Sequence, residues 1–276
     1  MYRSVYLLDK LVSCGRHKPM VLRDEQCRVL LPASEASYRA GSVEPSITLL
    51  QLAKSSDVAA HRLDHFAALA LCASTLGHTA AYMLQGGTQN DSLPPWDPNS
   101  EFVRIWSRLL ALEECIVPSD DGVFTHIEKD LRSGGQIDRQ RCGHFVFSRM
   151  LFHVNNILLN HPFLLWNKLQ SIDRTAPTSF LAESFKRCRA HAVAVLTVLE
   201  ESEAIGYDLE ASFLGYCVTV AGSVHCLYLH DAVDAVRTEA AKMVRSALTF
   251  LKRFSLIWNH GPRLVCSISN HETNPD

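Results

Sequence analysis

Apolar residues recur at helical spacing along most of this chain, and that periodicity constrains the fold more than any other feature. In the middle of the chain, Phe147, Leu151, Val154 and Leu158 follow one another at intervals of four, three and four. This spacing places side chains on one face of an α-helix, whereas the alternation typical of strands is weak throughout. We therefore predict an all-α fold, a large multi-helix, bundle-like domain with long loops. The predicted helices cover 2–14, 46–84 (two helices), 97–112, 147–161, 181–205, 211–230 and 231–258.

Glycine and proline divide the periodic segments. The residue before Pro162 is pushed out of helical conformation, so we expect the central helix to end there. Gly206 is a plausible stop for the following helix. Asp97-Pro98 has the form of a helix start, an aspartate N-cap followed by proline at the first helical position. Residues 118–142 are polar and contain turn signals, so they are expected to form a long connection.

The pattern contains no internal repeat, so we predict one domain over 1–266. The residues that follow Gly261-Pro262 carry no extended helical pattern. We therefore expect 267–276 to be a disordered tail.

Composition limits the kind of protein this is. The chain has 276 residues, of which 47% are apolar and 20% are charged, which is enough apolar material for a proper core. Its formal net charge is −2. A free-standing DNA-binding domain usually has a basic surplus, so we expect no direct DNA contact from these residues.

The nine cysteines are scattered along the chain without a Cys-x-x-Cys pair. Structural zinc sites need clustered ligands, so we expect neither a metal nor another cofactor. Isolated cysteines on apolar segments are usually buried and reduced, which favours a reducing compartment.

The uncharged stretch 211–229 nearly reaches the length that spans a membrane. It contains several serine, glycine and threonine residues, and its mean hydropathy is modest. We interpret it as a buried core helix and expect no membrane association. The N-terminal apolar segment contains Asp9 and Lys10, which argues against a signal peptide.

Two groups of histidines are candidates for chemistry. His61 and His65 are four residues apart, but Arg62 stands where the zinc-protease motif needs glutamate, so a solvated helix face is the better interpretation. His225 and His230 lie close to Asp231. They could form a metal or acid–base site, but we favour an interior histidine and a helix N-cap at the aspartate.

Carboxylates also occur in pairs, at Glu113-Glu114 and at Asp120-Asp121. Such residues at a helix end and a turn usually have local structural roles, and no calcium-loop spacing follows. The serine-nucleophile, P-loop and dinucleotide motifs are absent from the sequence.

Positive charge gathers toward the end of the 231–258 helix, and acidic residues stand near its start. Acid first and base last matches the helix dipole, so we interpret the cations as a solvated face. The cations are Arg237, Lys242, Arg245, Lys252 and Arg253, and the acidic residues are Asp231, Asp234 and Glu239.

Two segments carry a resemblance to a known family. The first begins Tyr6-Leu-Leu-Asp9-Lys10-Leu-Val-Ser13-Cys-Gly15-Arg16-His-Lys-Pro19 and reaches Leu31-Pro32 after an acidic stretch that includes Asp24. The second is Leu158-Leu-Asn-His161-Pro162-Phe163-Leu164. In this order and spacing they resemble the fungal-specific transcription factor domain, the helical regulatory region of zinc binuclear cluster transcription factors. The match extends over nearly the whole chain.

The resemblance assigns structural roles to ten residues, namely Asp9, Lys10, Ser13, Gly15, Arg16, Pro19, Pro32, His161, Pro162 and Phe163. Lys10 stands where the family more often has arginine, and His17-Lys18 are inserted before Pro19. Read without the family, Asp9 and Arg16 could pair with each other or cap a neighbouring helix. None of the ten is expected to be catalytic.

The resemblance also implies a function. It points to the regulatory domain of a fungal transcription factor in the nucleus, acting on RNA polymerase II transcription through protein partners or a homodimer and through a small-molecule effector. The family's N-terminal zinc cluster is missing, so the resemblance implies an N-terminally truncated domain without the cluster's zinc. The alternatives are a stand-alone interaction or dimerisation protein and, more remotely, an all-α enzyme, although no paired Glu-x-x-His motif supports the latter. We expect no enzymatic activity.

Overall fold

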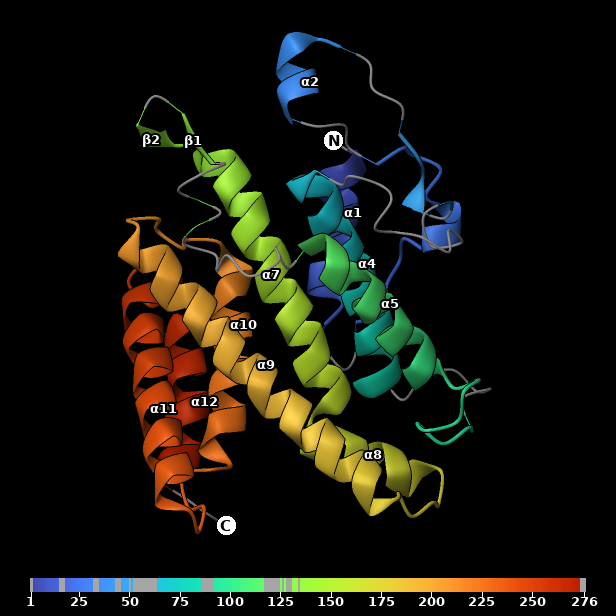
Figure 1. The fold of residues 1–276 in the computed structure, drawn as a ribbon, viewed down its shortest axis with the longest axis vertical. Helices are drawn as coiled ribbons and strands as arrows, with labels where there is room; N and C mark the ends of the chain where they lie inside the picture. The colour runs from blue at the N-terminus through green and yellow to red at the C-terminus, as the bar shows by residue number, and fades with distance from the viewer. Residues whose placement is uncertain are drawn as a thin grey trace.

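The computed structural model describes residues 2–14, 18–31, 35–42, 46–49, 51, 64–85, 92–116, 125, 127, 131–133 and 135–273. Helices dominate this part of the chain, which confirms the predicted all-α class (Figure 1). The helices are α1 (Tyr2–Val12), α2 (Glu35–Ala40), α4 (His65–Met83), α5 (Glu101–Ile116), α7 (Arg139–Asn160), α8 (Pro162–Ser171), α9 (Thr178–Ala204), α10 (Ser212–Cys226), α11 (Asp234–Phe254) and α12 (Gly261–Thr273). A short antiparallel hairpin pairs β1 (Arg132–Ser133) with β2 (Gln136–Ile137).

Helix α7 runs through the middle of the molecule (Figure 1). On one side it packs against α4 and α5, and α1 covers α4. On the other side it packs against α9 and α10, and α11 and α12 pack on α10. The fold is thus a helical bundle in which two groups of helices pack against opposite sides of α7.

The central position of α7 explains its composition. From Met150 to Asn160 every residue is buried, so this part of the helix has no solvent face. Its polar residues are satisfied internally. The Asn155 side chain donates to the Cys72 carbonyl of α4 at 3.1 Å and accepts from the Thr79 hydroxyl at 2.9 Å. A buried polar residue of this kind ties two helices together without an unpaired group.

Several predicted helix ends are confirmed. His161 is extended, with φ −66° and ψ 127°, so α7 ends before Pro162 and α8 begins with that proline. Gly206 follows α9 with a positive φ of 75°, a conformation that glycine adopts without strain.

The predicted start at Asp97-Pro98 is wrong by a few residues. Helix α5 begins at Glu101, and the Ser100 hydroxyl accepts from the Val103 N–H at 3.2 Å as the N-cap. Asp97 instead accepts from the Asn99 N–H within the preceding turn. The serine hydroxyl provides the same capping chemistry that we expected from the aspartate, three residues further along the chain.

The C-terminal prediction needs a larger correction. Residues 261–273 form α12, so 267–273 are helical and are not part of a disordered tail. The helix is held by Ile268, which is fully buried against α10. Gly222 of α10 makes room for it, since a Cβ there would lie 2.5 Å from the Ile268 Cδ1.

The described cysteines support the expected reduced core. Seven of them are buried, and within the described residues none forms a disulfide, while Cys266 is exposed. Burial raises the pKa of Cys14, Cys142 and Cys188 to about 12, so these thiols stay protonated.

The stretch 211–229 forms the buried core helix that we expected, α10. Within the described residues, one helix is long and apolar enough to cross a bilayer by length and composition, and that helix is α4. In the fold, 72% of its most apolar 18-residue segment is buried, as is usual for a core helix.

Candidate functional site

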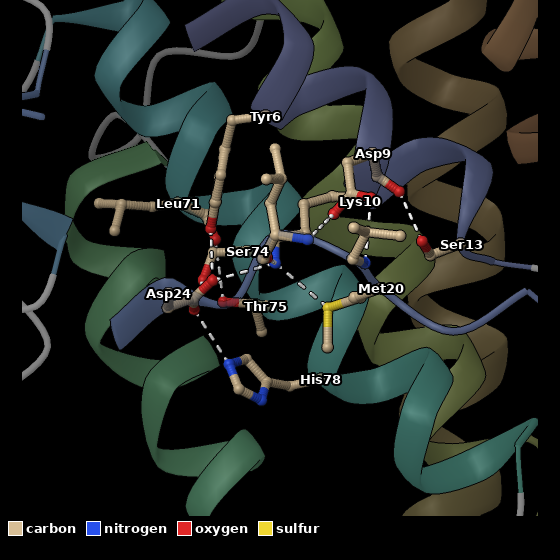
Figure 2. Close-up of polar contacts among 12 residues, drawn as sticks. Tyr6, Asp9, Lys10, Ser13, Met20, Asp24, Leu71, Ser74, Thr75 and His78 are labelled. Atoms are coloured by element: carbon tan, nitrogen blue, oxygen red, sulfur yellow. Dashed lines mark hydrogen bonds and ion pairs between the residues drawn. The ribbon is translucent and has the colours of Figure 1, made fainter. Parts of the chain in front are cut away.

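The densest group of polar side chains lies where α1, α4 and the segment between them meet. We call it the Lys10–Asp24 cluster; it consists of Tyr6, Lys10, Asp24, Ser74 and His78 (Figure 2). The Asp24 carboxylate accepts from the Tyr6 hydroxyl at 2.6 Å and from the Ser74 hydroxyl at 2.5 Å. His78 Nε2 lies 3.0 Å and Lys10 Nζ 3.1 Å from the same carboxylate.

Helical spacing aligns the donors. Tyr6 and Lys10 are four residues apart on the inner face of α1, and Ser74 and His78 are four apart on α4. Asp24 lies on a short 3-10 turn, Asp24–Gln26, that crosses between the two helices. Three segments that are distant in sequence therefore meet on one carboxylate.

Lys10 is an unusual residue for a core, because its side chain is 0% exposed. Besides Asp24, its ammonium contacts the Leu22 carbonyl and lies 3.3 Å from the Met20 sulfur. It also lies over the Tyr6 ring, 4.7 Å from the ring centre. A buried lysine needs such partners, since an isolated charge away from water is costly.

The surroundings keep Asp24 ionised. Burial alone would raise the pKa of this carboxyl, but hydrogen bonds from His78, Ser74 and Tyr6 and the Lys10 charge hold it far below its usual range. The reverse applies to Tyr6. Burial, reinforced by the Asp24 charge, raises the pKa of its phenol well above the ordinary value. The phenol therefore remains a hydrogen-bond donor at any physiological pH.

Asp9 and Ser13 secure the same region from the other face of α1. The Asp9 carboxylate accepts from the backbone N–H groups of Val21 and Leu22, both at 3.1 Å. The Ser13 hydroxyl donates to the Asp9 carbonyl at 2.6 Å. Asp9 therefore does not cap a neighbouring helix, as we had considered, but fixes the backbone of the segment after α1.

The other predicted structural residues are spread out. Pro19 is exposed in that same segment, while Gly15, Arg16 and Pro32 lie outside the described residues. At the corner between α7 and α8, burial lowers the pKa of His161 to about 4. Pro162 occupies the first turn of α8, and Phe163 is 59% exposed. The structure thus brings Asp9, Lys10 and Ser13 together and places the His161 corner elsewhere.

Sequence reasoning named Lys10 and Asp24 but missed their partners. Ser74 and His78 are polar residues four apart on the otherwise apolar helix α4, and that pattern was the available signal. Their pairing with a residue 50 positions earlier gave no sign in the sequence.

The chemistry of the cluster is that of a joint between segments. Asp24 receives four donors and is held ionised, so it has little capacity to accept a further proton as a general base. Lys10 is paired and enclosed, which leaves no room for a substrate carbonyl at its amine. The geometry therefore favours a structural role.

A separate pocket of about 210 Å³ lies between α1, α4, α7, α10 and the α9–α10 connection. Apolar side chains from α1, α4, α7 and α10 form most of its wall, and Tyr207 and Glu210 from the α9–α10 connection lie at its edge. At Gly143 a Cβ would lie 2.8 Å from the Tyr207 hydroxyl oxygen, so a larger residue here would require the Tyr207 side chain to shift. The lining includes Leu7, Phe66, Leu69, Val146, Phe147 and Leu214.

The histidines in the described part of the chain do not assemble a metal site. Within the described residues, no group of three or more His, Cys, Asp or Glu side chains could hold a metal ion. His65 packs edge-on against the Phe145 ring, and His61 lies outside the described residues. His225 is buried on α10, as expected for an interior histidine, whereas His230 is exposed.

Asp231 does not cap α11, which differs from our expectation. Helix α11 begins at Asp234 with Val233 at the N-cap position, and Asp231 accepts from the Val233 N–H at 2.9 Å. Among the paired carboxylates, Asp120-Asp121 lie outside the described residues, while Glu113-Glu114 lie in the last turn of α5.

A buried histidine pair that we did not predict joins α7 to α9. The Nδ1 atoms of His153 and His191 are 2.9 Å apart, so one ring donates to the other. Burial lowers the pKa of both rings, that of His191 to about 4, and each ring also lies near an arginine, Arg149 or Arg187. Both histidines are therefore neutral at physiological pH.

Comparison with curated proteins relates this chain, distantly, to fungal transcription factors. The relatives are Zn(2)-C6 fungal-type transcription factors of Fusarium oxysporum f. sp. lycopersici. FTF1a is 22% identical over 267 residues, FTF1c 21% over 272 residues and FTF2 21% over 267 residues. Each match covers 92% of this chain but only 23%, 27% and 24% of the relative, so the chain spans about a quarter of their length.

No family model matches the chain, and no solved structure matches it significantly. The resemblance to fungal transcription factors is thus confirmed as a distant relationship. The more specific domain assignment stays a prediction.

Proposed function

We propose that this chain is a regulatory module of a fungal transcription regulator that acts in the nucleus on RNA polymerase II transcription through protein contacts. The similarity to three named transcription factors over 92% of the chain carries this proposal. The all-α architecture agrees with the helical regulatory domain that the sequence resembles. We propose no catalytic activity, in keeping with the saturated Lys10–Asp24 cluster.

A transcription reporter tests this function. The chain is fused to an unrelated DNA-binding domain and expressed in a fungal host that carries the matching reporter. A nuclear fusion that changes reporter output at least about tenfold supports the proposal, and a DNA-binding domain alone is the control. A folded, nuclear fusion that leaves the reporter unchanged argues against it. If that fusion still co-purifies with a relative such as FTF1a, the stand-alone interaction protein becomes the better description.

We further propose that the pocket beside α1 holds a small-molecule effector. Its walls are mainly apolar, which is typical of ligand sites, and its volume of about 210 Å³, below that of most ligand pockets, limits the ligand to a small molecule. Because four helices and the α9–α10 connection line it, a ligand there would stabilise their present packing over alternatives.

The effector proposal is tested by filling the pocket. Ala211 lines it but is itself exposed, so Ala211→Trp would occupy the opening without disturbing the core. Ser212→Trp, at the next exposed position, is the matched control. We expect compact apolar metabolites to raise the melting temperature of the unmodified chain and of Ser212→Trp, but not of Ala211→Trp. Equal shifts for all three chains would contradict binding in this pocket.

A further inference from the structure

The cations of α11 separate into two sets that the sequence did not distinguish. Arg237 pairs with Asp234 on the same helix, and Arg253 pairs with Glu203 of α9. Lys242, Arg245 and Lys252 are exposed, and among the described residues none of the three makes an ion pair. Both sets belong to the solvated face that the sequence predicted, but only the first set has acidic partners.

The three unpaired cations form one row. Their positions, with Thr249 between the second and third, follow spacings of three, four and three along α11. This spacing keeps them on one stripe of the helix, opposite the buried face, over about 15 Å at 1.5 Å per residue. We call Lys242, Arg245, Thr249 and Lys252 the basic ridge. All four side chains are exposed, and α11 lies at the edge of the molecule (Figure 1).

Nearby carboxylates are already engaged. Between α9 and α11, Glu239 pairs with Arg189, Glu203 pairs with Arg253, and Glu200 accepts from the Ser246 hydroxyl at 3.0 Å. These contacts draw the acidic groups into the α9 interface and away from the ridge. The ridge therefore presents a local positive field on a chain whose formal net charge is −2.

An apolar patch continues the ridge. Leu256 follows Lys252 after four residues and is 87% exposed, and the adjacent Ile257 is 59% exposed. Both lie in the turn that follows α11, four and five residues after Lys252, so the ridge and these two aliphatic side chains make a surface with charge along its length and an apolar end.

We propose that the basic ridge with Leu256 and Ile257 docks an acidic peptide segment that carries apolar side chains at one end. Carboxylates would pair with Lys242, Arg245 and Lys252, and the apolar residues would cover Leu256 and Ile257. Charge complementarity selects this partner, because phosphates alone would leave the aliphatic end unused. A membrane surface fits less well, since the apolar face of α11 is buried in the bundle and only two side chains could insert. The inference rests on the proposed function in one respect: the docked peptide would be one of the protein contacts through which the regulatory module acts.

The test is direct binding to the purified chain. The probe is a fluorescent synthetic peptide of about 14 residues with aspartates at helical spacing and two leucines at one end. At a helical rise of about 1.5 Å per residue, this length covers the ridge and the apolar patch. Controls are a peptide with lysine in place of each aspartate and a peptide with serine in place of each leucine. A duplex DNA oligonucleotide and anionic phospholipid vesicles are measured in parallel.

We expect saturable binding of the acidic–apolar peptide that weakens with added salt. Arg245→Glu should lower its affinity at least tenfold. Lys186→Glu, which makes the same change in charge at an exposed position on α9, should change it less than twofold. The exposed double substitution Leu256→Ser and Ile257→Ser should also weaken binding tenfold, and circular dichroism would verify the fold of each variant.

Three results would overturn the proposal: no binding of the probe, equal effects of the Arg245 and Lys186 substitutions, or tighter binding to DNA or vesicles than to the peptide. These outcomes are separate from failure of the proposed function. The peptide can bind a chain that leaves the reporter unchanged, and a chain that alters the reporter can fail to bind the peptide.

Discussion

At the scale of single residues, Lys10 stands out as a charged side chain in the core. It is fully enclosed, and its partner Asp24 is held ionised by four donors. Such a pair is weak evidence for extra stability, because taking both charges out of water offsets much of their attraction. Removing one partner is different, since the other charge is then left buried and uncompensated.

We therefore expect Lys10→Met to lower the free energy of unfolding by about 3 kcal/mol. Urea titration followed by circular dichroism measures it. Lys242→Met removes an exposed, unpaired cation and should stay within about 0.5 kcal/mol.

A double-mutant cycle separates the pair from the general cost of altering a core. If Lys10 and Asp24 act together, Lys10→Met with Asp24→Asn should cost clearly less than the sum of the single substitutions. Additive effects would show that the ion pair contributes no coupling, and the cluster would then be a set of independent hydrogen bonds.

The sequence predicted single residues less well than elements. Asp9 and Lys10 could be named because they interrupt an otherwise apolar segment, and Asp24 because the family resemblance includes an acidic stretch there. Their geometry could not be predicted, because it depends on the crossing of α1 over α4, which brings together residues 54 positions apart at Asp24 and His78. The His153–His191 contact was hidden for the same reason.

At the scale of elements, the helices with long apolar stripes were predicted well, whereas the shorter helices α2, α8 and α12 were not predicted. Among the described side chains of α12, Leu264, Val265 and Ile268 are the apolar residues that pack against the core, and a glycine–proline start precedes them. So few periodic positions cannot be distinguished from chance in the sequence. The helix exists because α10 offers Gly215 and Gly222, where missing side chains let Leu264 and Ile268 approach closely.

Ile268→Ala tests whether this docking contributes to the stability of the whole domain. The substitution deletes a fully buried side chain, so we expect a loss of about 2–4 kcal/mol in the free energy of unfolding. Cys266→Ala changes an exposed residue on the same helix and should have little effect. If both substitutions were neutral, α12 would contribute nothing to the cooperative fold.

At the scale of the whole molecule, the bundle encloses several neutral histidines. Burial lowers the pKa of His161, His191 and His225 to about 4 and that of His153 well below its ordinary value of 6.5. In the unfolded chain these rings take up protons near pH 6.5. Because the folded state binds fewer protons over this range, its stability falls as the pH drops from about 6.5 toward 4.

The expected result is a stability curve that is flat above about pH 7 and declines on acidification by up to about 1.4 kcal/mol per pH unit for each such histidine. Urea midpoints at a series of pH values measure it. His161→Gln removes one titrating ring and should make the decline shallower, whereas the same change at exposed His230 should not. A stability that is independent of pH between 7 and about 4.5 would contradict the neutral, buried state of these rings.

The Lys10–Asp24 cluster also affects the abundance of this protein in the cell. It holds α1 over α4, the most membrane-like helix in the described part of the chain. If that joint opened, apolar side chains of α4 that cluster with Tyr6, such as Ala67 and Ala70, would be exposed to water, which is the kind of surface that chaperones and proteases recognise. Substitutions at this single carboxylate or its lysine would therefore reduce the protein's abundance in the cell before they altered any of its contacts.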